Sequence, residues 1–240
     1  MNGEGLAPAH KFAWALLVVA VAGLVSYAFW KKTRIIEPDL TGRNSPQLGV
    51  PRSDAPKPED LAVYDQVKKF TLTDQHGKNV EAKDLLGEVW VANFIFTHCA
   101  GTCPLITRQM AELDKELADL PSVKLISFSM DPENDTPDVL AKYAFTQDAV
   151  SPRWKFLTGT KDEIYRVTKE EFKLVVDDKN GTKAEPIIHS TKIVLVDAQG
   201  FIRGRFDAFG MDGPKPEAIK LLAASVRKLR SLPPVKTDSK

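Results

Sequence analysis

Cysteine is scarce in this chain of 240 residues, which contains only two. Two cysteines are too few for the disulfide framework that stabilises small secreted domains. The net charge is only +1 and no basic stripe stands out, so we expect no nucleic-acid partner. The sequence has no internal repeat. With 43% hydrophobic and 27% charged residues, it has the composition of an ordinary globular protein.

The two cysteines, Cys99 and Cys103, stand four residues apart. They follow the apolar run 88–96, which is typical of a central strand, and precede Pro104, which suits the first turn of a helix. Unpaired amides and the helix dipole stabilise thiolates at such a position. Thiolates bind soft metals, attack disulfides and reduce peroxides. The pair therefore predicts one of these three activities, with Cu(I) or zinc as the favoured metal.

A metal held by two thiolates normally needs a third ligand, and the chain has four histidines. His10 precedes an apolar segment, and His76 lies in a predicted turn. His98 adjoins Cys99 and would turn onto the same ion only with difficulty. His189 stands at the entrance of a predicted strand, which can lie beside the cysteine loop. It is the candidate ligand, although a structural role for it stays open on sequence alone.

The segment from Phe12 to Trp30 contains no charged residue, and its nineteen residues approach the length that spans a bilayer. We predict an uncleaved anchor, with a cleaved signal peptide as the alternative. The cluster Lys31, Lys32 and Arg34 follows the span and, by the positive-inside rule, favours a cytoplasmic C-terminal side. Four regions are expected: a membrane anchor (1–32), a proline-rich tether (33–62), a folded domain (63–232) and a tail (233–240).

Hydrophobic periodicity within the folded domain predicts alternating strands and helices. The expected order is a hairpin over 70–80, a strand at 88–96, a helix from 104 to 120, a strand at 123–130, a helix over 136–144, a short strand at 154–157, a helix over 160–172, short extended segments at 174–176 and 191–196, a turn into 201–203, and a helix over 216–229. This order is typical of an α/β sandwich with a mixed sheet. In that architecture ligands bind at the carboxyl edge of the sheet.

Four segments of the domain carry a resemblance to a known family. They are 70–77 (FTLTDQHG), 96–104 (FTHCAGTCP), 129–137 (SMDPENDTP) and 189–197 (HSTKIVLVD). In this order they resemble the successive motifs of the Sco/SenC family, which are membrane-anchored copper proteins with a thioredoxin fold. The resemblance extends over about residues 67–230, and the N-terminal span fits it too.

The resemblance implies a thioredoxin-like mixed sheet flanked by helices, behind a single transmembrane helix and a flexible tether. It also implies a copper site, for Cu(I) or Cu(II), made by Cys99, Cys103 and His189. The implied role is delivery of copper to the binuclear centre of cytochrome c oxidase, or reduction of the cysteines of that centre or of other exported proteins. The partners would be the oxidase subunit that holds this centre and another copper chaperone or thiol reductant. The domain would lie in the periplasm or an equivalent non-cytoplasmic space, whereas Lys31, Lys32 and Arg34 favour a cytoplasmic location by the positive-inside rule.

Two departures from the family pattern affect the site. Ala-Gly-Thr separates the cysteines where many members have Pro-Asp and an aliphatic residue, and Ile188 stands where many have Asp. The second departure leaves open what orients the His189 ring. For Asp131 and Asp135 we expect helix-capping or loop-closing roles rather than ligation.

Two other activities remain open. A thiol–disulfide reductase would use Cys99 and Cys103 as its catalytic pair, one attacking and one resolving, although the usual CxxC spacing is missing. A thiol peroxidase would need a cation beside its reactive cysteine, and the sequence offers only His98 there.

Overall fold

The computed structural model describes residues 61–180, 187–210 and 213–233. Its elements are β1 (Thr71–Asp74), β2 (Asn79–Glu81), η2 (Ala82–Leu85), β3 (Trp90–Ile95), α2 (Thr102–Glu116), β4 (Lys124–Ser129), α3 (Pro137–Thr146), β5 (Trp154–Thr158), α4 (Lys161–Arg166), η3 (Val167–Glu171), β6 (Val176–Asp177), β7 (Ile188–His189), β8 (Lys192–Val196), β9 (Ile202–Asp207), β10 (Phe209–Gly210), β11 (Gly213–Pro214) and α5 (Pro216–Ser231). The predicted mixed α/β order is confirmed.

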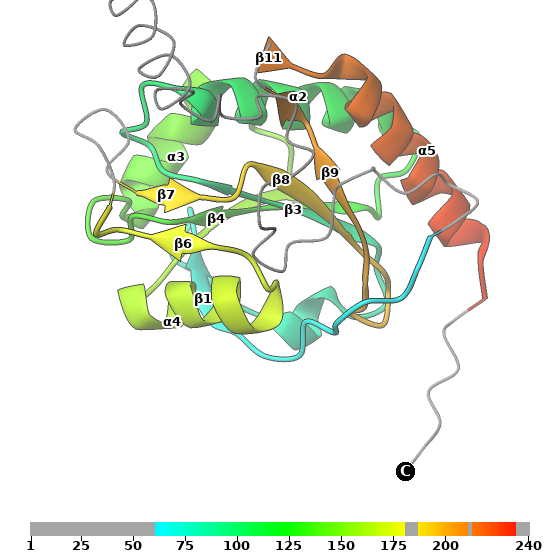
Figure 1. Ribbon diagram of the computed structural model, residues 1–240, viewed down its shortest axis with the longest axis horizontal. Coiled ribbons are helices and arrows are strands. Elements are labelled where there is room, and N and C mark those ends of the chain that lie inside the picture. The colour runs from blue at the N-terminus through cyan, green and yellow to red at the C-terminus, as the bar shows by residue number, and fades with distance from the viewer. Residues whose placement is uncertain (1–60, 181–186, 211–212, 234–240) are drawn as a thin grey trace, which may run out of the picture. The chain divides into compact units, whose positions relative to one another are not determined.

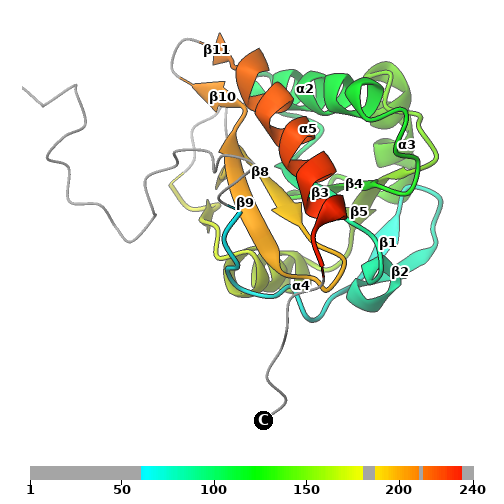
Figure 2. The same cartoon turned by 90° about the vertical axis from the view of Figure 1, so that its right-hand side faces the viewer.

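Seven strands form the main sheet, in the order β2-β1-β5-β4-β3-β8-β9. Figure 1 shows the sheet among its helices, and Figure 2 labels every strand of it. Strands β3, β4 and β5 run parallel, whereas β1, β2, β8 and β9 join by antiparallel pairing. Because β8 runs opposite to β3, the beginning of β8 lies at the edge where β3 and β4 end. The loops after β3 and β4 and the segment before β8 therefore meet at one edge of the sheet.

Helices cover both faces of this sheet. Helices α2, α3 and α5 lie on one face and α4 on the other (Figures 1 and 2), and α2 packs against α5. Every residue of β3 is buried, as expected for a central strand. On the α4 side Phe94 stacks on Phe128 with ring centroids 5.5 Å apart, and Phe172 meets both rings edge-on. This aromatic cluster fixes β3, which carries the cysteine loop at its end.

Two helix starts follow the expected capping rules. The hydroxyl of Thr136 accepts a hydrogen bond from the amide of Val139, with Pro137 as the first helical residue. The hydroxyl of Thr160 likewise accepts from the amide of Glu163. The predicted helix over 160–172 differs in one respect, since after Arg166 it continues as a π-helical turn, η3. The Thr168 side chain donates to the carbonyl of Ile164 there, a bond that bends helices.

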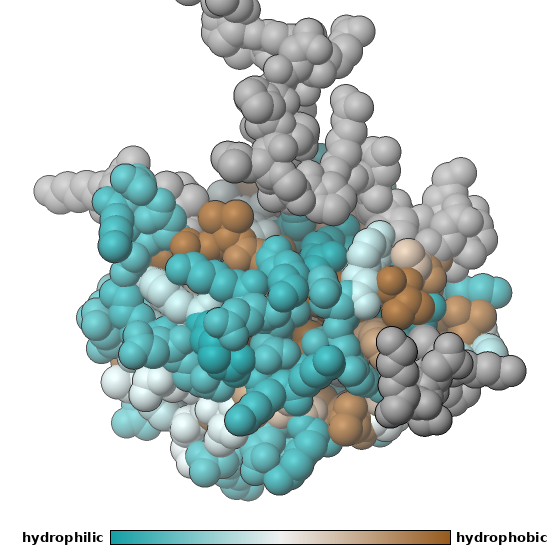
Figure 3. Space-filling model, turned by 60° about the horizontal axis from the view of Figure 1, so that its bottom comes forward, coloured by the Kyte–Doolittle hydropathy of each residue, from teal (hydrophilic) through white to brown (hydrophobic). Residues whose placement is uncertain are grey.

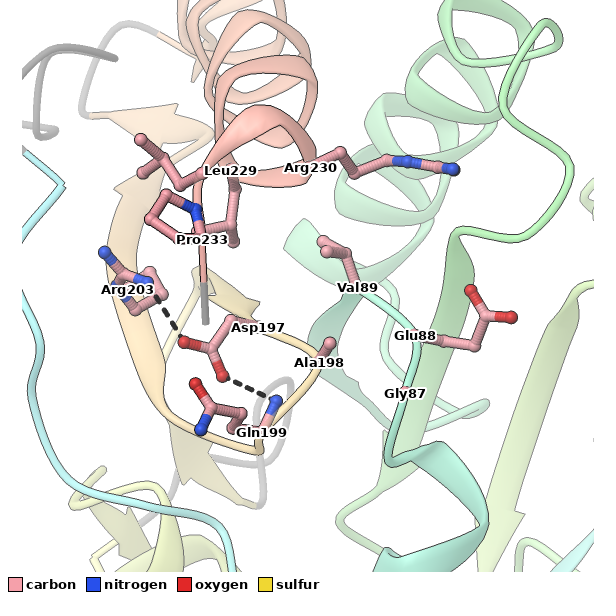
Figure 4. A pocket seen from close by; sticks show the side chains of 11 residues that line it. Gly87, Glu88, Val89, Asp197, Ala198, Gln199, Arg203, Leu229, Arg230 and Pro233 are labelled. Atoms are coloured by element: carbon pink, nitrogen blue, oxygen red, sulfur yellow. Dashed lines mark hydrogen bonds and ion pairs between the residues drawn. The ribbon is translucent and has the colours of Figure 1, made fainter. Parts of the chain in front are cut away.

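The start of the described chain is fastened to the sheet by Arg203 on β9. Its guanidinium donates to the carbonyls of Leu61 and Ala62 at 3.0 and 2.8 Å and pairs with the buried Asp197 at 3.0 Å. This pair borders a cavity of about 230 Å³ that also reaches Gly87, before β3 (Figure 4). The cavity thus lies at the edge of the sheet opposite the cysteine loop, which follows β3.

The predicted membrane span falls on residues 12–30, outside the described residues. Among the helices that the structure describes, none combines the length and the apolar character that a bilayer crossing requires. The face in Figure 3, which brings the bottom of Figure 1 forward, is mostly hydrophilic, and its hydrophobic side chains stand in small separate groups. The described residues visible on that face therefore form no broad apolar surface.

Candidate functional site

The three residues proposed as metal ligands come from the elements that meet at the carboxyl edge of the sheet. Cys99 lies in the loop after β3, Cys103 is the second residue of α2, and His189 ends the short strand β7. Strand β7 pairs with β6 outside the main sheet, with His189 opposite Val176. Both cysteines are buried and are not joined by a disulfide.

The N-terminus of α2 stabilises a thiolate on Cys99. This helix starts at Thr102 with no side chain capping its amides. The pKa of Cys99 is lowered from 9.0 to about 5, chiefly by a hydrogen bond from the Cys103 side chain. Burial opposes this shift, while bonds from the amides of Cys103, Gly101 and Thr102 add to it. The Cys99 sulfur thus accepts the amide bonds that a capping side chain would otherwise accept.

The ring of His189 is oriented by its own neighbours. Its Nδ1 lies 3.1 Å from the carbonyl oxygen of Ser190, and its ring meets Phe96 edge-on at 5.6 Å. A carbonyl only accepts, so Nδ1 carries the proton, and in the neutral ring Nε2 presents a lone pair. Nε2 lies 3.5 Å from Sγ of Cys103. A backbone carbonyl therefore fixes the tautomer, which answers the question raised by Ile188.

The Cys103–His189 pair is compatible with a shared metal ion. A sulfur at ~2.3 Å and a nitrogen at ~2.0 Å from one tetrahedral ion stand about 3.5 Å apart, and these two atoms are 3.5 Å apart. Two thiols and one imidazole also form a soft donor set. Within the described residues, however, no three His, Cys, Asp or Glu side chains are already arranged to hold a metal. The three-ligand set therefore stays a prediction.

The hydroxyl groups of two buried residues, Thr107 and Tyr143, hold the backbone of Cys103 in the first turn of α2. The hydroxyl of Thr107 donates to the carbonyl of Cys103 at 2.9 Å, and it lies 2.9 Å from the hydroxyl of Tyr143 on α3. Because the Thr107 proton goes to the carbonyl, the Tyr143 hydroxyl donates to Thr107. Burial raises the pKa of Tyr143, and the nearby cysteines raise it further. The phenol therefore stays protonated and links α3 to the first turn of α2.

The other candidate residues lie as the sequence suggested. The side chain of His98 is 63% exposed, with Nδ1 4.0 Å from the carboxylate of Asp135. His76 is exposed in the turn between β1 and β2, and Met110 is fully buried in the core. Asp135 closes a loop by accepting hydrogen bonds from Thr97 and Ser129. Sequence patterns did not reveal Thr107, Tyr143 or Ser190 as supports of the site.

A thioredoxin-like mixed sheet with a thiol pair at the start of a helix defines the class of this protein. A family model described as SCO1/SenC matches residues 59–224. The chain therefore belongs to the SCO1/SenC family. It is 42% identical over 137 residues to the SCO1 protein homolog of Bacillus subtilis, which covers 56% of this chain and 70% of that protein.

Solved structures of the same family share the fold. BsSco, described as a member of the Sco family of cytochrome c oxidase assembly proteins with a disulfide switch, is 34% identical, with a TM-score of 0.58 over 72% of this chain and 96% of that one. Copper-bound ScoI of Bradyrhizobium japonicum is 28% identical, with a TM-score of 0.54 over 68% of this chain and 98% of that one.

Proposed function

We propose that this protein is a copper metallochaperone that serves the binuclear copper centre of cytochrome c oxidase. The 3.5 Å contact between His189 Nε2 and Cys103 Sγ carries the proposal, because it places a nitrogen donor against a thiol. The low pKa of Cys99, about 5, supplies a thiolate beside this pair at neutral pH. Copper-bound relatives of the same fold support the choice of metal. With the Cys99 thiolate as the third ligand, this donor set would hold Cu(I) or Cu(II).

Metal analysis of the full chain in detergent tests the proposal. The reduced protein should bind about one copper ion, whereas Cys99→Ser and Cys103→Ser should each lose tight binding because soft copper prefers thiolate. His76→Ala is the control, since that exposed histidine lies in the β1–β2 turn. Full copper content in either cysteine variant would contradict the proposal. Cells with these variants should also fail to assemble the oxidase.

Thiol–disulfide reduction is the second candidate, favoured by the thiolate of Cys99 beside Cys103. Cys99 would attack a partner disulfide and release one partner thiolate. Cys103 would then attack the mixed disulfide, so that the partner leaves as a dithiol and Cys99–Cys103 carries the two oxidising equivalents. A peroxidase is less well supported, because a thiol and backbone amides, rather than a cationic side chain, lower the pKa of Cys99.

Mild oxidation tests whether Cys99 and Cys103 form a disulfide and whether copper binding requires their reduced thiols. The intact chain should lose two hydrogen atoms by mass without forming a dimer, and it should then bind no copper, because oxidation consumes the thiolates. Both thiols persisting under an oxidant that closes small dithiols would exclude the reductase reading.

The proposed role requires the thiol domain to lie outside the cytoplasm, held by a span at residues 12–30. Protease added to intact spheroplasts should then digest the domain. Digestion only after lysis would support the opposite topology, which Lys31, Lys32 and Arg34 favour, and would count against a role in oxidase assembly.

A further inference from the structure

Asp135 is a fully buried carboxyl group beside the cysteine loop. Its oxygens accept the backbone amide of Thr97 at 3.1 and 3.3 Å and the hydroxyl of Thr97 at 2.5 Å. They also accept the hydroxyl of Ser129 at 2.6 Å. All three donors belong to the chain at or just beyond the ends of β3 and β4. One carboxyl group therefore joins the two loops that meet at the carboxyl edge of the sheet.

This carboxyl group is unusual for a buried one, because no Lys or Arg among the described residues forms an ion pair with it. Within the described residues, the only ion-pair partner of Asp135 is the exposed His98, whose Nδ1 is 4.0 Å away. Burial raises the pKa of Asp135, against the bonds from Ser129 and Thr97 that lower it. A buried carboxyl group without a cation is costly. Capping α3 does not account for that cost, since Thr136 caps this helix.

The bonds of Asp135 fasten the turn that leads into Cys99. Thr97 lies within this turn, which is closed by a hydrogen bond from the Cys99 amide to the Phe96 carbonyl at 3.3 Å. Asp135 is itself held firmly, because its amide donates to the carbonyl of Asp131 at 2.8 Å. A displacement of Thr97 would move Cys99 relative to the first amides of α2. Thr97 and Asp135 are thus placed to control where the Cys99 sulfur sits.

We propose that Asp135 is a positioning residue for the thiol pair. It acts through Thr97 and keeps the Cys99 sulfur against Cys103 and the amides of residues 101–103. The inference deepens the proposed copper function and rests on it, because the group that is positioned is the proposed copper site. Its direct effect falls on the metal-free thiols, which can be measured whether or not copper binds.

Four variants of the full chain in detergent, reduced and metal-free, test this role. Asp135→Leu removes every acceptor, whereas Asp135→Asn keeps an oxygen for Thr97. Thr97→Val removes one donor and leaves the carboxyl group in place. Asp74→Asn is the control, because Asp74 is equally buried but accepts the amides of His76 and Lys78 in the β1–β2 turn and pairs with Lys155 at 2.7 Å, away from the cysteine loop.

The readout is the pH midpoint of Cys99 alkylation, followed by peptide mass spectrometry, together with the unfolding midpoint. We expect Asp135→Leu to raise the alkylation midpoint by about one pH unit or more, a tenfold loss of thiol acidity. Thr97→Val should raise it by a smaller amount, and Asp135→Asn should stay closer to the unaltered chain than Asp135→Leu. Asp74→Asn should lower the unfolding midpoint and leave the alkylation midpoint unchanged.

Four outcomes would overturn the proposal. An unchanged alkylation midpoint in a folded Asp135→Leu would make the residue merely structural, and so would equal shifts in Asp135→Leu and Asp74→Asn. A lower midpoint would mean that the carboxyl group acts by its charge. If Asp135→Leu does not fold, Thr97→Val decides, and an unshifted midpoint there would refute the role. Failure of the unaltered chain to bind copper would instead contradict the proposed function.

Discussion

His189 and Cys103 are 86 positions apart in the sequence, yet Nε2 of the imidazole lies 3.5 Å from Sγ of the thiol. The contact forms because β8 runs antiparallel to β3, which brings the segment before β8 to the edge where β3 ends. The Ser190 carbonyl then turns the Nε2 lone pair of His189 toward the sulfur. Chain topology thus supplies a nitrogen donor that no local motif around the cysteines provides.

This relationship predicts a selective effect of His189→Ala. Cu(II) prefers nitrogen together with sulfur, whereas Cu(I) tolerates two thiolates alone. The variant should therefore lose the sulfur-to-copper charge-transfer absorption of the Cu(II) form, retain most Cu(I) binding and still close the Cys99–Cys103 disulfide. Optical spectra after copper addition measure the first effect, and His76→Ala serves as the control. Unchanged Cu(II) spectra together with normal oxidase assembly would make His189 a structural residue.

The low pKa of Cys99 predicts a pH-dependent contribution to stability. The folded value is about 5 and the ordinary value is 9.0, so folding favours the thiolate. This contribution is fully present above about pH 9 and is lost as the pH falls through about 5. The difference in free energy of unfolding between the reduced chain and Cys99→Ser should therefore grow from pH 5 to pH 9. A difference that stays constant over this range would show that the thiol is not acidified in the folded protein.

Substitutions of Tyr143 test the hydrogen bonds that link its hydroxyl through Thr107 to the carbonyl of Cys103. Tyr143→Phe keeps the ring, which packs edge-on against Phe156 at 6.0 Å, but removes the donor to Thr107. We expect a loss of about 1 kcal/mol in the free energy of unfolding, the usual net value of one hydrogen bond. Tyr143→Ala should cost roughly 3–5 kcal/mol, because it also leaves a cavity. Urea unfolding of the reduced chain measures both, and equal losses would mean that the ring contributes nothing beyond the hydroxyl.

Much of the fold was predictable because its signals are local. The continuous apolar run at β3, the Thr136-Pro137 start of α3 and the glycine turn between β1 and β2 each specify their structure within a few residues. The cysteine loop was predictable for the same reason, since both thiols and the helix start lie in one short segment.

The residues that support the site were harder to predict from the sequence, because their contacts depend on the order of the strands in the sheet. Asp135 lies in a proline-containing run that is typical of a turn, and its burial follows only from the adjacency of β3 and β4. Thr107 is one polar residue on the apolar face of α2, and its partner Tyr143 comes from another helix. Strands β6 and β7 have two residues each, too few for a periodic pattern.

The hydrogen bonds from Arg203 to the carbonyls of Leu61 and Ala62 bear on where the folded domain begins. The sequence placed this boundary at residue 63, but the guanidinium binds the carbonyls of Leu61 and Ala62 as well as Asp197. A fragment that starts at 63 would leave a buried guanidinium with two donors unpaired, and hydrogen bonds to charged groups contribute about 1.5–3 kcal/mol each. We therefore expect a fragment over 61–232 to be more stable than one over 63–232 by at least about 1 kcal/mol in urea unfolding. In Arg203→Met, which keeps much of the apolar stem, this difference should nearly vanish. If the two fragments are equally stable with Arg203 intact, these hydrogen bonds contribute nothing to the free energy of unfolding and the boundary at 63 stands.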